Sequence, residues 1–263
     1  MKENKLRYLL DHNLPSISTR LWSSNPFFTE GVGSTGYYDY VEFLAEYVPF
    51  SQMDMENLCR AAELHDMGTM IKIDFQNRGY VAQKAMGAGF QSILFTDCET
   101  PEQVEESIYL AKPETPEDKG RFGYPNRRFI GFQPRIPQMD HAERVRNVVL
   151  CFMIEKVEAV KNIEKICSIP GVDMIQFGPS DYSMSCGFNA KDHRDEFKAA
   201  ERHCIEVALS HGVQPRCEIP NVEAAQYYID LGVKHFSLGD QLSILLNAWS
   251  SGGKLLKEIT EQL

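Results

Sequence analysis

The sequence predicts a closed (β/α)8 barrel, a fold in which eight parallel strands alternate with helices. Short β-rich runs alternate with amphipathic helical patterns along most of the 263 residues. Eight such units in a chain of this length are typical of the barrel, and an open doubly wound sheet is the alternative. The chain has neither a G-x-G-x-x-G motif after an early strand nor a Walker A loop, so the phosphate signature of a dinucleotide-binding sheet is missing.

Eight segments carry the short, β-rich pattern of barrel strands. In chain order they are Ser16–Trp22, Tyr38–Leu44, Thr69–Asp74, Gln91–Thr96, Val148–Glu155, Val172–Gly178, Gly212–Glu218 and Val233–Leu238. Successive side chains of a strand point to opposite faces, so each strand contributes residues to the barrel interior and to its helix-covered outside in turn. The length suits one large domain, and we expect residues 1–263 to form a single barrel.

Amphipathic patterns between these segments predict the covering helices. The clearest are Met53–Met67, Pro101–Ala111, Lys156–Ser168 and Asn221–Leu231. Pro101 stands at a first-turn position, where a missing N–H costs no hydrogen bond. Asn221 is of a type that caps helix N-termini.

Two segments depart from the strand-and-helix alternation. Residues 112–140 form a long insertion that contains Pro113, Pro116, Pro125, Pro134 and Pro137. A loop of this length in a compact domain is usually functional or part of an interface, and a solvent-exposed insertion is the alternative. Near the C-terminus, Ser250-Ser251-Gly252-Gly253 is expected to break the last helix and act as a hinge.

After that break, residues 254–263 are expected to form a helical arm. Its apolar stripe consists of Leu255, Leu256, Ile259 and Leu263. Such a stripe must pack on something, either on its own barrel or on a neighbouring subunit. The predicted fold is therefore a barrel with an exchanged or extended C-terminal helix.

Composition limits the partners of this chain. It has 27 Lys+Arg against 37 Asp+Glu, a formal net charge of -10, so we expect neither nucleic acid nor a membrane surface as a partner. No segment reaches about 18 apolar residues, and the N-terminus lacks a signal-peptide core. The seven cysteines are widely spaced and form no C-x-x-C motif, which predicts free thiols in a reducing cytoplasm.

Two carboxylates fall at the ends of neighbouring expected strands, where barrel enzymes carry their catalytic groups. Alternation along the fifth strand places Cys151, Met153 and Glu155 on the interior face. Asp181 follows the Gly-Pro turn that ends the sixth strand. A Glu and an Asp on one rim suit a hard divalent cation; the alternative is that each caps a helix or pairs with a lysine.

The stretches around these carboxylates resemble the HpcH/HpaI aldolase family. They are an I-E-x-x-x-A motif over residues 154–159 and a G-V-D-x-x-x-x-G-P-x-D-x-S motif over residues 171–183, and the similarity extends over nearly the whole chain. The resemblance implies a (β/α)8 barrel that makes and breaks carbon–carbon bonds of 2-oxo acids such as pyruvate. It also implies a divalent cation (Mg, Mn or Co) that stabilises an enolate, and a homo-oligomer, a hexamer.

The resemblance assigns roles to individual residues. Glu155 and Asp181 match the two metal ligands. The backbone around Gly178 and Ser180 matches the turn that holds the substrate carboxylate at a helix N-terminus. Glu46 matches a polar residue of the same site and is expected to contact the substrate.

The residue on the third strand departs from the family pattern. The family has an arginine that contacts the keto oxygen, and the matching residue here is Lys72. Alternation points Lys72 inward, so it is expected to be catalytic. It offers a point charge in place of a planar fork; a Schiff-base lysine and a structural salt bridge are the alternatives.

The family's acid/base pair, an Asp and a His in a D-x-E-H run, is also replaced. The run here has Leu44 for the Asp and Tyr47 for the His, and Met153 replaces a glutamine. Tyr47 is either a proton donor or a wall of the pocket, since a phenol with a pKa of about 10 is a poor base. Of the seven histidines, His235 on the last strand is the one expected nearest the barrel mouth.

These replacements leave several functions open. The leading hypothesis is a metal-dependent lyase (an aldolase) that acts on a 2-oxo acid. An oxaloacetate-type decarboxylase would use the same site and needs no base for a hydroxyl proton. A relative of the CoA-thioester lyases, and a catalytically weakened barrel that binds a metal and a carboxylate ligand, are the further alternatives.

Overall fold

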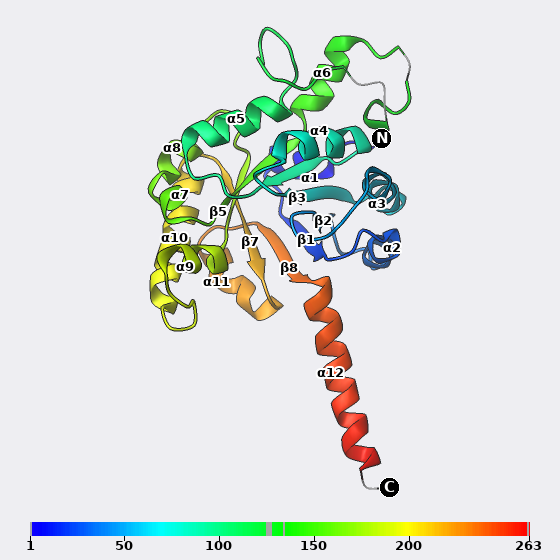
Figure 1. Cartoon of the computed structure of the whole chain (residues 1–263), viewed down its shortest axis with the longest axis vertical. Coiled ribbons are helices and arrows are strands. Elements are labelled where there is room, and N and C mark those ends of the chain that lie inside the picture. The colour runs from blue at the N-terminus through cyan, green and yellow to red at the C-terminus, as the bar shows by residue number, and fades with distance from the viewer. Residues whose placement is uncertain (1, 125–127, 134, 262) are drawn as a thin grey trace.

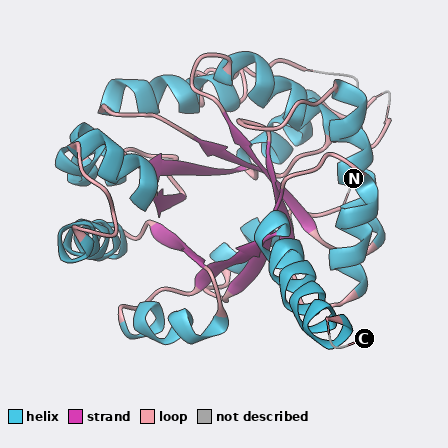
Figure 2. Cartoon of the chain, turned by 60° about the horizontal axis from the view of Figure 1, so that its bottom comes forward, coloured by secondary structure: helices cyan, strands magenta, loops and turns pink. Residues whose placement is uncertain are grey.

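The computed structural model describes residues 2–124, 128–133, 135–261 and 263, and its core is a closed barrel of eight parallel strands (Figures 1 and 2). Each strand pairs with the next along the chain, and β8 pairs with β1 to close the barrel. The strands are β1 (Ser16–Leu21), β2 (Tyr40–Leu44), β3 (Gly68–Ile73), β4 (Ser92–Phe95), β5 (Val149–Ile154), β6 (Met174–Phe177), β7 (Gln214–Ile219) and β8 (His235–Asp240). The predicted fold and all eight predicted strands are confirmed, with boundaries shifted by a few residues.

Helices connect the strands and surround the barrel (Figure 2). They are α1 (Lys5–Asp11), α2 (Pro26–Ser34), α3 (Gln52–Leu64), α4 (Arg78–Ala88), α5 (Pro101–Ala111), α6 (Gln138–Arg146), α7 (Val157–Lys161), α8 (Ile163–Cys167), α9 (Pro179–Cys186), α10 (Arg194–Ser210), α11 (Ala225–Asp230) and α12 (Gln241–Thr260), with short 3-10 turns η1 (Arg128–Ile130) and η2 (Val222–Ala224). Because each covering helix runs back from the carboxyl end of one strand to the start of the next, the loops after the strands gather at one end of the barrel, its mouth.

Alternation along β5 divides its residues between two separate cores, as the sequence predicts. Cys151 and Met153 belong to the cluster inside the barrel, which Leu6 of α1 joins. Leu150 and Phe152 belong to the larger cluster between the strands and the helices. Glu155, which follows Met153 by two positions, is therefore expected to point toward the barrel interior at its mouth.

The predicted helices are confirmed in position, and two of them differ in form. Pro101 begins α5 behind a Thr100 capping box. The segment 156–168 is two short helices, because the chain turns at Asn162, whose side chain donates a hydrogen bond to the Glu99 carbonyl at 3.1 Å. Asn221 acts as a cap by accepting from the Ala224 N–H, but a 3-10 turn precedes α11.

The insertion 112–140 lies at the end of the barrel opposite the mouth, because α5 runs back along the strands before it. Phe122, Phe129 and Ile130 are buried in the outer core, and Arg128 donates to both carboxylate oxygens of Glu63 at 2.8 and 2.7 Å. Much of the described segment thus packs on the barrel. Pro125 and Pro134 lie outside the described residues.

The C-terminal helix projects away from the barrel (Figure 1), as an extended helix. The expected break at Ser250–Gly253 is wrong, since α12 runs without interruption from Gln241 to Thr260 and none of its residues is buried. Two serines and two glycines lower helix propensity by only about 3 kcal/mol in total, and helix-forming leucine, alanine and lysine residues flank them. No helix among the described ranges is both long and apolar enough to cross a membrane.

The expectation for His235 is also wrong. His235 is the first residue of β8, so it lies at the end of the barrel opposite the mouth. It is buried there, and its Nδ1 lies 2.8 Å from the Ser16 hydroxyl. Burial, helped by the charges of Lys234 and Arg216, lowers the pKa of His235 to about 4.

This buried histidine predicts a pH-dependent stability. The unfolded chain takes up a proton near pH 6.5, and the folded chain only near pH 4, so acid favours the unfolded state. We expect the unfolding free energy to fall by about 3 kcal/mol as the pH falls through this window, because only the unfolded chain protonates its histidine there. Above pH 6.5 the histidine is neutral in both states, and this loss of stability is absent. Urea titrations of the protein and of His235→Gln, at both ends of the window, measure this difference. Parallel pH profiles for the two proteins would contradict it.

Candidate active site at the barrel mouth

The mouth carries the two carboxylates that the sequence singles out. Glu155 follows the last residue of β5, and Asp181 lies in the first turn of α9, directly after β6. β5 and β6 are hydrogen-bonded neighbours, with Met153 opposite Gln176. Both carboxylates therefore reach the rim from adjacent strand ends.

Glu155 is buried, with only 2% of its surface exposed. Its Oε1 accepts a hydrogen bond from the Asp97 N–H at 3.0 Å. Burial raises the pKa of Glu155 to about 7, against the opposing effect of the nearby Lys72 ammonium. A buried carboxylate has lost most of its hydrating water, so its charged form is stabilised when a cation binds to it.

Gly178 leaves room for the Glu155 carboxylate. A Cβ at this position would lie 2.8 Å from the Glu155 Cβ and 3.0 Å from its Oε2. The Gly178 N–H itself donates to the Ile154 carbonyl, at 3.0 Å, and so it is engaged in the sheet. The donors that remain for a substrate carboxylate are the first-turn N–H groups of Ser180 and Asp181, which have no partner within their own helix.

A lysine balances the acidic side of the rim. The Lys156 ammonium lies 2.8 Å from Asp97 Oδ1 and 3.8 Å from Asp181 Oδ1. This is the alternative pairing that the sequence left open for Asp181. The longer distance to Asp181, whose side chain is 36% exposed, leaves its carboxylate accessible to a ligand.

These residues fit a hard divalent cation. Their oxygen donors are charged, and the absence of a side chain at Gly178 lets the Glu155 carboxylate keep its position at the rim. Within the residues that the structure describes, no three His, Cys, Asp or Glu side chains converge on a metal position. Such an ion would therefore be held by Glu155 and Asp181 and completed by water and substrate oxygens, as magnesium sites often are.

Lys72 points into the mouth from β3, as predicted. It is buried, its Nζ lies 2.8 Å from Glu46 Oε2, and it donates to the Tyr47 hydroxyl at 2.8 Å. Burial alone would lower the pKa of Lys72, but the carboxylates of Glu155 and Glu46 outweigh it and raise the pKa. Lys72 is therefore a fixed positive charge beside Glu155.

Tyr47 forms one side of the mouth. Its ring stacks on Trp22 with centroids 5.6 Å apart, and about half of the residue is exposed. Burial raises the pKa of Tyr47 to about 12, although Lys72 acts against this rise. The phenol is therefore protonated at neutral pH and cannot serve as a base, whereas a wall or a proton donor remains consistent with its place.

A large cavity opens beside these residues. It has a volume of about 1380 Å³ and reaches Phe177 and Pro179, which flank Gly178. Its strand-end lining also includes Arg20, Glu218 and Asp240, from β1, β7 and β8. Arg20 and Glu218 are not among the site residues predicted from the sequence. Glu218 could have been found, because it stands at the end of an expected strand. Its pairing with Arg20 could not, because it depends on closure of the barrel.

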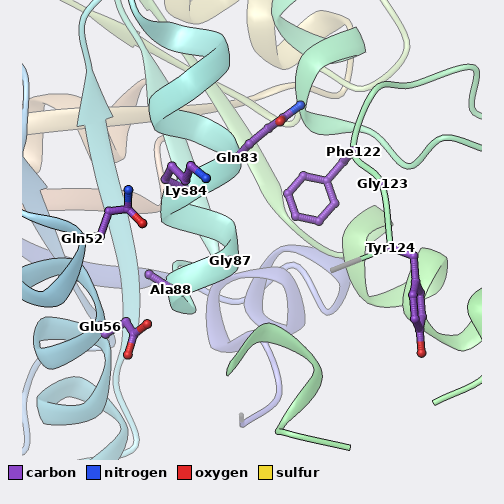
Figure 3. A pocket seen from close by; sticks show the side chains of 9 residues that line it. All are labelled: Gln52, Glu56, Gln83, Lys84, Gly87, Ala88, Phe122, Gly123 and Tyr124. Atoms are coloured by element: carbon purple, nitrogen blue, oxygen red, sulfur yellow. The ribbon is translucent and has the colours of Figure 1, made fainter. Parts of the chain in front are cut away.

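A second cavity, of about 280 Å³, lies on the outside of the barrel (Figure 3). Gln52 and Glu56 of α3 line it from one side, and Lys84 of α4 and Tyr124 line it from the others. None of the predicted site residues lines this cavity. The large cavity also contacts the predicted site only through Phe177 and Pro179, beside Gly178. The barrel mouth is singled out because Glu155, Asp181 and Lys72 come together there.

A (β/α)8 barrel with two carboxylates and a buried lysine at its mouth has the arrangement typical of barrel enzymes, whose catalytic groups lie at the strand ends. The chain belongs to the HpcH/HpaI aldolase/citrate lyase family, whose model matches residues 51–248. It is thus a carbon–carbon lyase of a family that depends on divalent metals.

Known proteins support this membership over almost the full length. The chain is 23% identical to the 4-hydroxy-2-oxo-heptane-1,7-dioate aldolase of Escherichia coli, over 94% of this chain and 92% of that protein. The crystal structure of an HpcH/HpaI aldolase from Desulfitobacterium hafniense superposes with a TM-score of 0.87 at 20% identity, covering 96% of each chain. A citrate lyase beta subunit from M. tuberculosis, complexed with oxaloacetate and magnesium, superposes with a TM-score of 0.58 at 12% identity, covering 88% of this chain and 93% of that one.

Proposed function

We propose that this protein is a divalent-metal-dependent aldolase that cleaves and forms carbon–carbon bonds of a pyruvate-like 2-oxo acid. The observation that carries the proposal is the placement of Glu155 and Asp181 on adjacent strand ends, with Gly178 allowing the chain between them to pass close to the Glu155 carboxylate. The aldolases among the relatives act on such acids by name, and a magnesium complex among the neighbours supports magnesium as the metal.

Each side chain has a distinct task in this proposal. Glu155 and Asp181 hold the cation, which when bound withdraws electron density from the keto group. The Lys72 ammonium faces the keto oxygen and stabilises the negative charge that develops there, while Glu46 fixes its position through their ion pair. The free N–H groups of Ser180 and Asp181 bind the substrate carboxylate, and Tyr47 closes the mouth and can donate a proton.

A screen with added metal tests this function. The protein is freed of metal, supplied with magnesium, manganese or cobalt, and incubated with 4-hydroxy-2-oxo acids or with pyruvate and aldehydes. We expect metal-dependent formation of pyruvate or of aldol products, identified by mass spectrometry. Turnover only with CoA thioesters, or none above background with every 2-oxo acid, would reject the proposal.

Decarboxylation of an oxaloacetate-type acid is the second candidate. Leu44 is buried at the position of the family's aspartate, and Tyr47, with its raised pKa, replaces the histidine. Loss of CO2 needs stabilisation of an enolate but no base for a hydroxyl proton, so these replacements favour it. Comparing pyruvate release from oxaloacetate with pyruvate release from 4-hydroxy-2-oxo acids separates the two reactions.

Lys72 is expected to act by charge and not as an imine. Its pKa is raised, so the amine is protonated and is a poor nucleophile. Treatment with pyruvate and borohydride should therefore leave the mass of the protein unchanged, as measured by intact-protein mass spectrometry. Lys72→Met treated in parallel is the control, and a reduced pyruvate adduct on Lys72 would contradict the assignment.

We further propose that residues 1–263 act as one domain and assemble into a homo-oligomer, a hexamer, in the cytoplasm. The long α12 supports assembly, because its apolar side chains are exposed in the single chain; they include Leu242, Leu246, Trp249, Leu255, Leu256 and Ile259. The arm 254–263 would dock on a neighbouring subunit. All seven cysteines are free thiols, in keeping with a reducing compartment.

Removal of the arm tests the assembly. Deleting residues 254–263 removes Leu255, Leu256 and Ile259, each of which contributes about 1.5–3 kcal/mol if buried in an interface. We expect light scattering to show smaller particles, dimers or monomers, for the truncated protein. A truncated protein that keeps the full assembly mass would show that the arm is not an interface element.

A further inference from the structure

A third carboxylate faces the mouth from β7, which is separated from β5 and Glu155 by β6 alone. Glu218 lies near the end of β7, where it lines the large cavity. Arg20 of β1 donates to its Oε2 at 2.6 Å, and Gln176 of β6 donates to its Oε1 at 2.6 Å. Each oxygen thus has one donor and keeps acceptor capacity, and 27% of the side chain is exposed.

The neighbouring acidic residues have other partners. Glu42, inside the barrel, has no exposed side-chain surface and is paired with Arg216. Asp240 caps α12 by accepting from the Ser243 N–H at 3.0 Å, and it also accepts from the Trp22 ring N–H at 2.9 Å. Of these three carboxylates, Glu218 is the one available to a ligand in the cavity.

A buried network holds Glu218 in place. Gln176, which donates to Glu218, accepts in turn from Arg216, whose guanidinium also donates to the Tyr40 hydroxyl at 2.7 Å and to the Ser18 hydroxyl at 3.0 Å. Arg216 is fully buried. The carboxylate is therefore positioned from below by side chains with little freedom to move, as expected for a catalytic group.

We propose that Glu218 is the catalytic base that exchanges a proton with the hydroxyl group of a 4-hydroxy-2-oxo acid, and that Arg20 and Gln176 position it. The inference rests on the proposed aldolase function and adds a residue to that site. Glu218 would carry out the proton transfer that falls to the family's Asp and His pair, which Leu44 and Tyr47 replace in this chain.

The proposed step is balanced within the substrate and one carboxylate. Glu218 takes the hydroxyl proton from the oxygen on C4, and the electron pair of that O–H bond forms the C=O bond of the released aldehyde. The C3–C4 bond breaks, and its electron pair becomes the C2=C3 bond of an enolate with its charge on the keto oxygen. Glu218 then returns the proton to C3, which yields the 2-oxo acid and restores the carboxylate.

The electrostatic surroundings suit this role. Burial raises the pKa of Glu218, and the charge of Arg20 limits the rise. The charges that act on Glu218 are those of Arg20, Glu42 and Lys72, from other strands, and of Arg216, two residues earlier on β7. Asp240 on β8 lies 3.8 Å from the Arg20 guanidinium. A carboxylate with a raised pKa is a more effective base near neutral pH than one exposed to water.

Two reactions of the magnesium-loaded protein distinguish a catalytic role of Glu218 from a structural one. Cleavage of 4-hydroxy-2-oxopentanoate requires the hydroxyl proton transfer, whereas decarboxylation of oxaloacetate does not. In Glu218→Gln we expect the kcat of cleavage to fall roughly 100-fold or more, the decarboxylation rate to change less than about 10-fold, and the Kd of pyruvate to stay the same. Glu218→Asp, which keeps the charge and shortens the reach, should show the same bias to a smaller degree and replaces Glu218→Gln if that variant fails to fold.

The control is Glu63→Gln, a carboxylate at the end of α3 that accepts from Arg128 at 2.8 and 2.7 Å, away from the mouth, and should leave the ratio of the two rates unchanged. An equal loss of cleavage and decarboxylation, with weaker pyruvate binding, would assign Glu218 a structural role and overturn the proposal. Unchanged cleavage in both Glu218 variants would also overturn it, with the aldolase function intact. A wild-type protein that cleaves no 4-hydroxy-2-oxo acid overturns the function and this inference together.

Discussion

Replacement of either rim carboxylate should abolish metal-dependent activity. We expect Glu155→Ala and Asp181→Ala each to lose at least roughly 1000-fold in kcat/KM, because each removes a charged oxygen from the single ion that offsets the enolate charge. Both proteins should stay folded, since Glu155 contributes one backbone hydrogen bond and Asp181 lies near the surface. Calorimetric titration with magnesium and manganese should show a parallel loss of metal affinity.

Glu158→Ala is a matched control for this experiment. Glu158 lies three residues after Glu155, in α7, and its partner is Lys161 at 3.2 Å on the surface. We expect it to keep activity and metal affinity within about 2-fold, since an exposed pair of this kind contributes at most about 1 kcal/mol. Unchanged activity with tight metal retention in Glu155→Ala or Asp181→Ala would refute the site.

Filling the space beside Glu155 should have the second largest effect. In Gly178→Ala the new methyl group would lie 2.8 Å from the Glu155 Cβ and 2.9 Å from the Met153 Cε. We expect the carboxylate to be displaced, with metal affinity and kcat each reduced roughly 100-fold, since a small misplacement of a catalytic group is enough for such a loss. Overpacking should also lower the unfolding free energy by about 1–3 kcal/mol.

Gly31→Ala separates this effect from the loss of a glycine as such. A Cβ at Gly31, in α2, would meet nothing within 4 Å, and alanine favours a helix. It should therefore keep full activity and equal or higher stability in the same thermal melts. A Gly178→Ala protein with wild-type metal affinity would mean that the Glu155 carboxylate does not hold the ion.

The eight strands could be predicted because each is a short β-rich segment between turns or helical patterns, and the more apolar ones have two faces that differ. β5 shows this most clearly, since Cys151 and Phe152 fall into different cores as alternation requires. The helical break at Ser250–Gly253 could not be judged in the same way. Local propensity favoured an interruption, but the helix-forming residues on both sides stabilise a continuous helix.

The site residues also divide into those that the sequence could predict and those that it could not. Glu155, Asp181 and Lys72 could be found because strand ends meet at the mouth of a barrel, and the structure brings all three to that rim. His235 lies on the predicted strand but at its first residue, so the expectation that it would be near the mouth is wrong. Arg20 and Glu218 are 198 residues apart in the sequence, and only closure of β8 on β1 brings their strands together.

If the proposed assembly forms through α12, this protruding helix would link the survival of each chain to its concentration. A 20-residue helix extends about 30 Å, so a lone chain presents to water a length of apolar side chains, with Trp249 63% exposed. If copies shelter one another's helices, dilution exposes them again, and the stability of the protein rises with its concentration by mass action. Newly made chains without partners would be the first to be captured by chaperones and cut by proteases, so that cellular abundance would follow assembly.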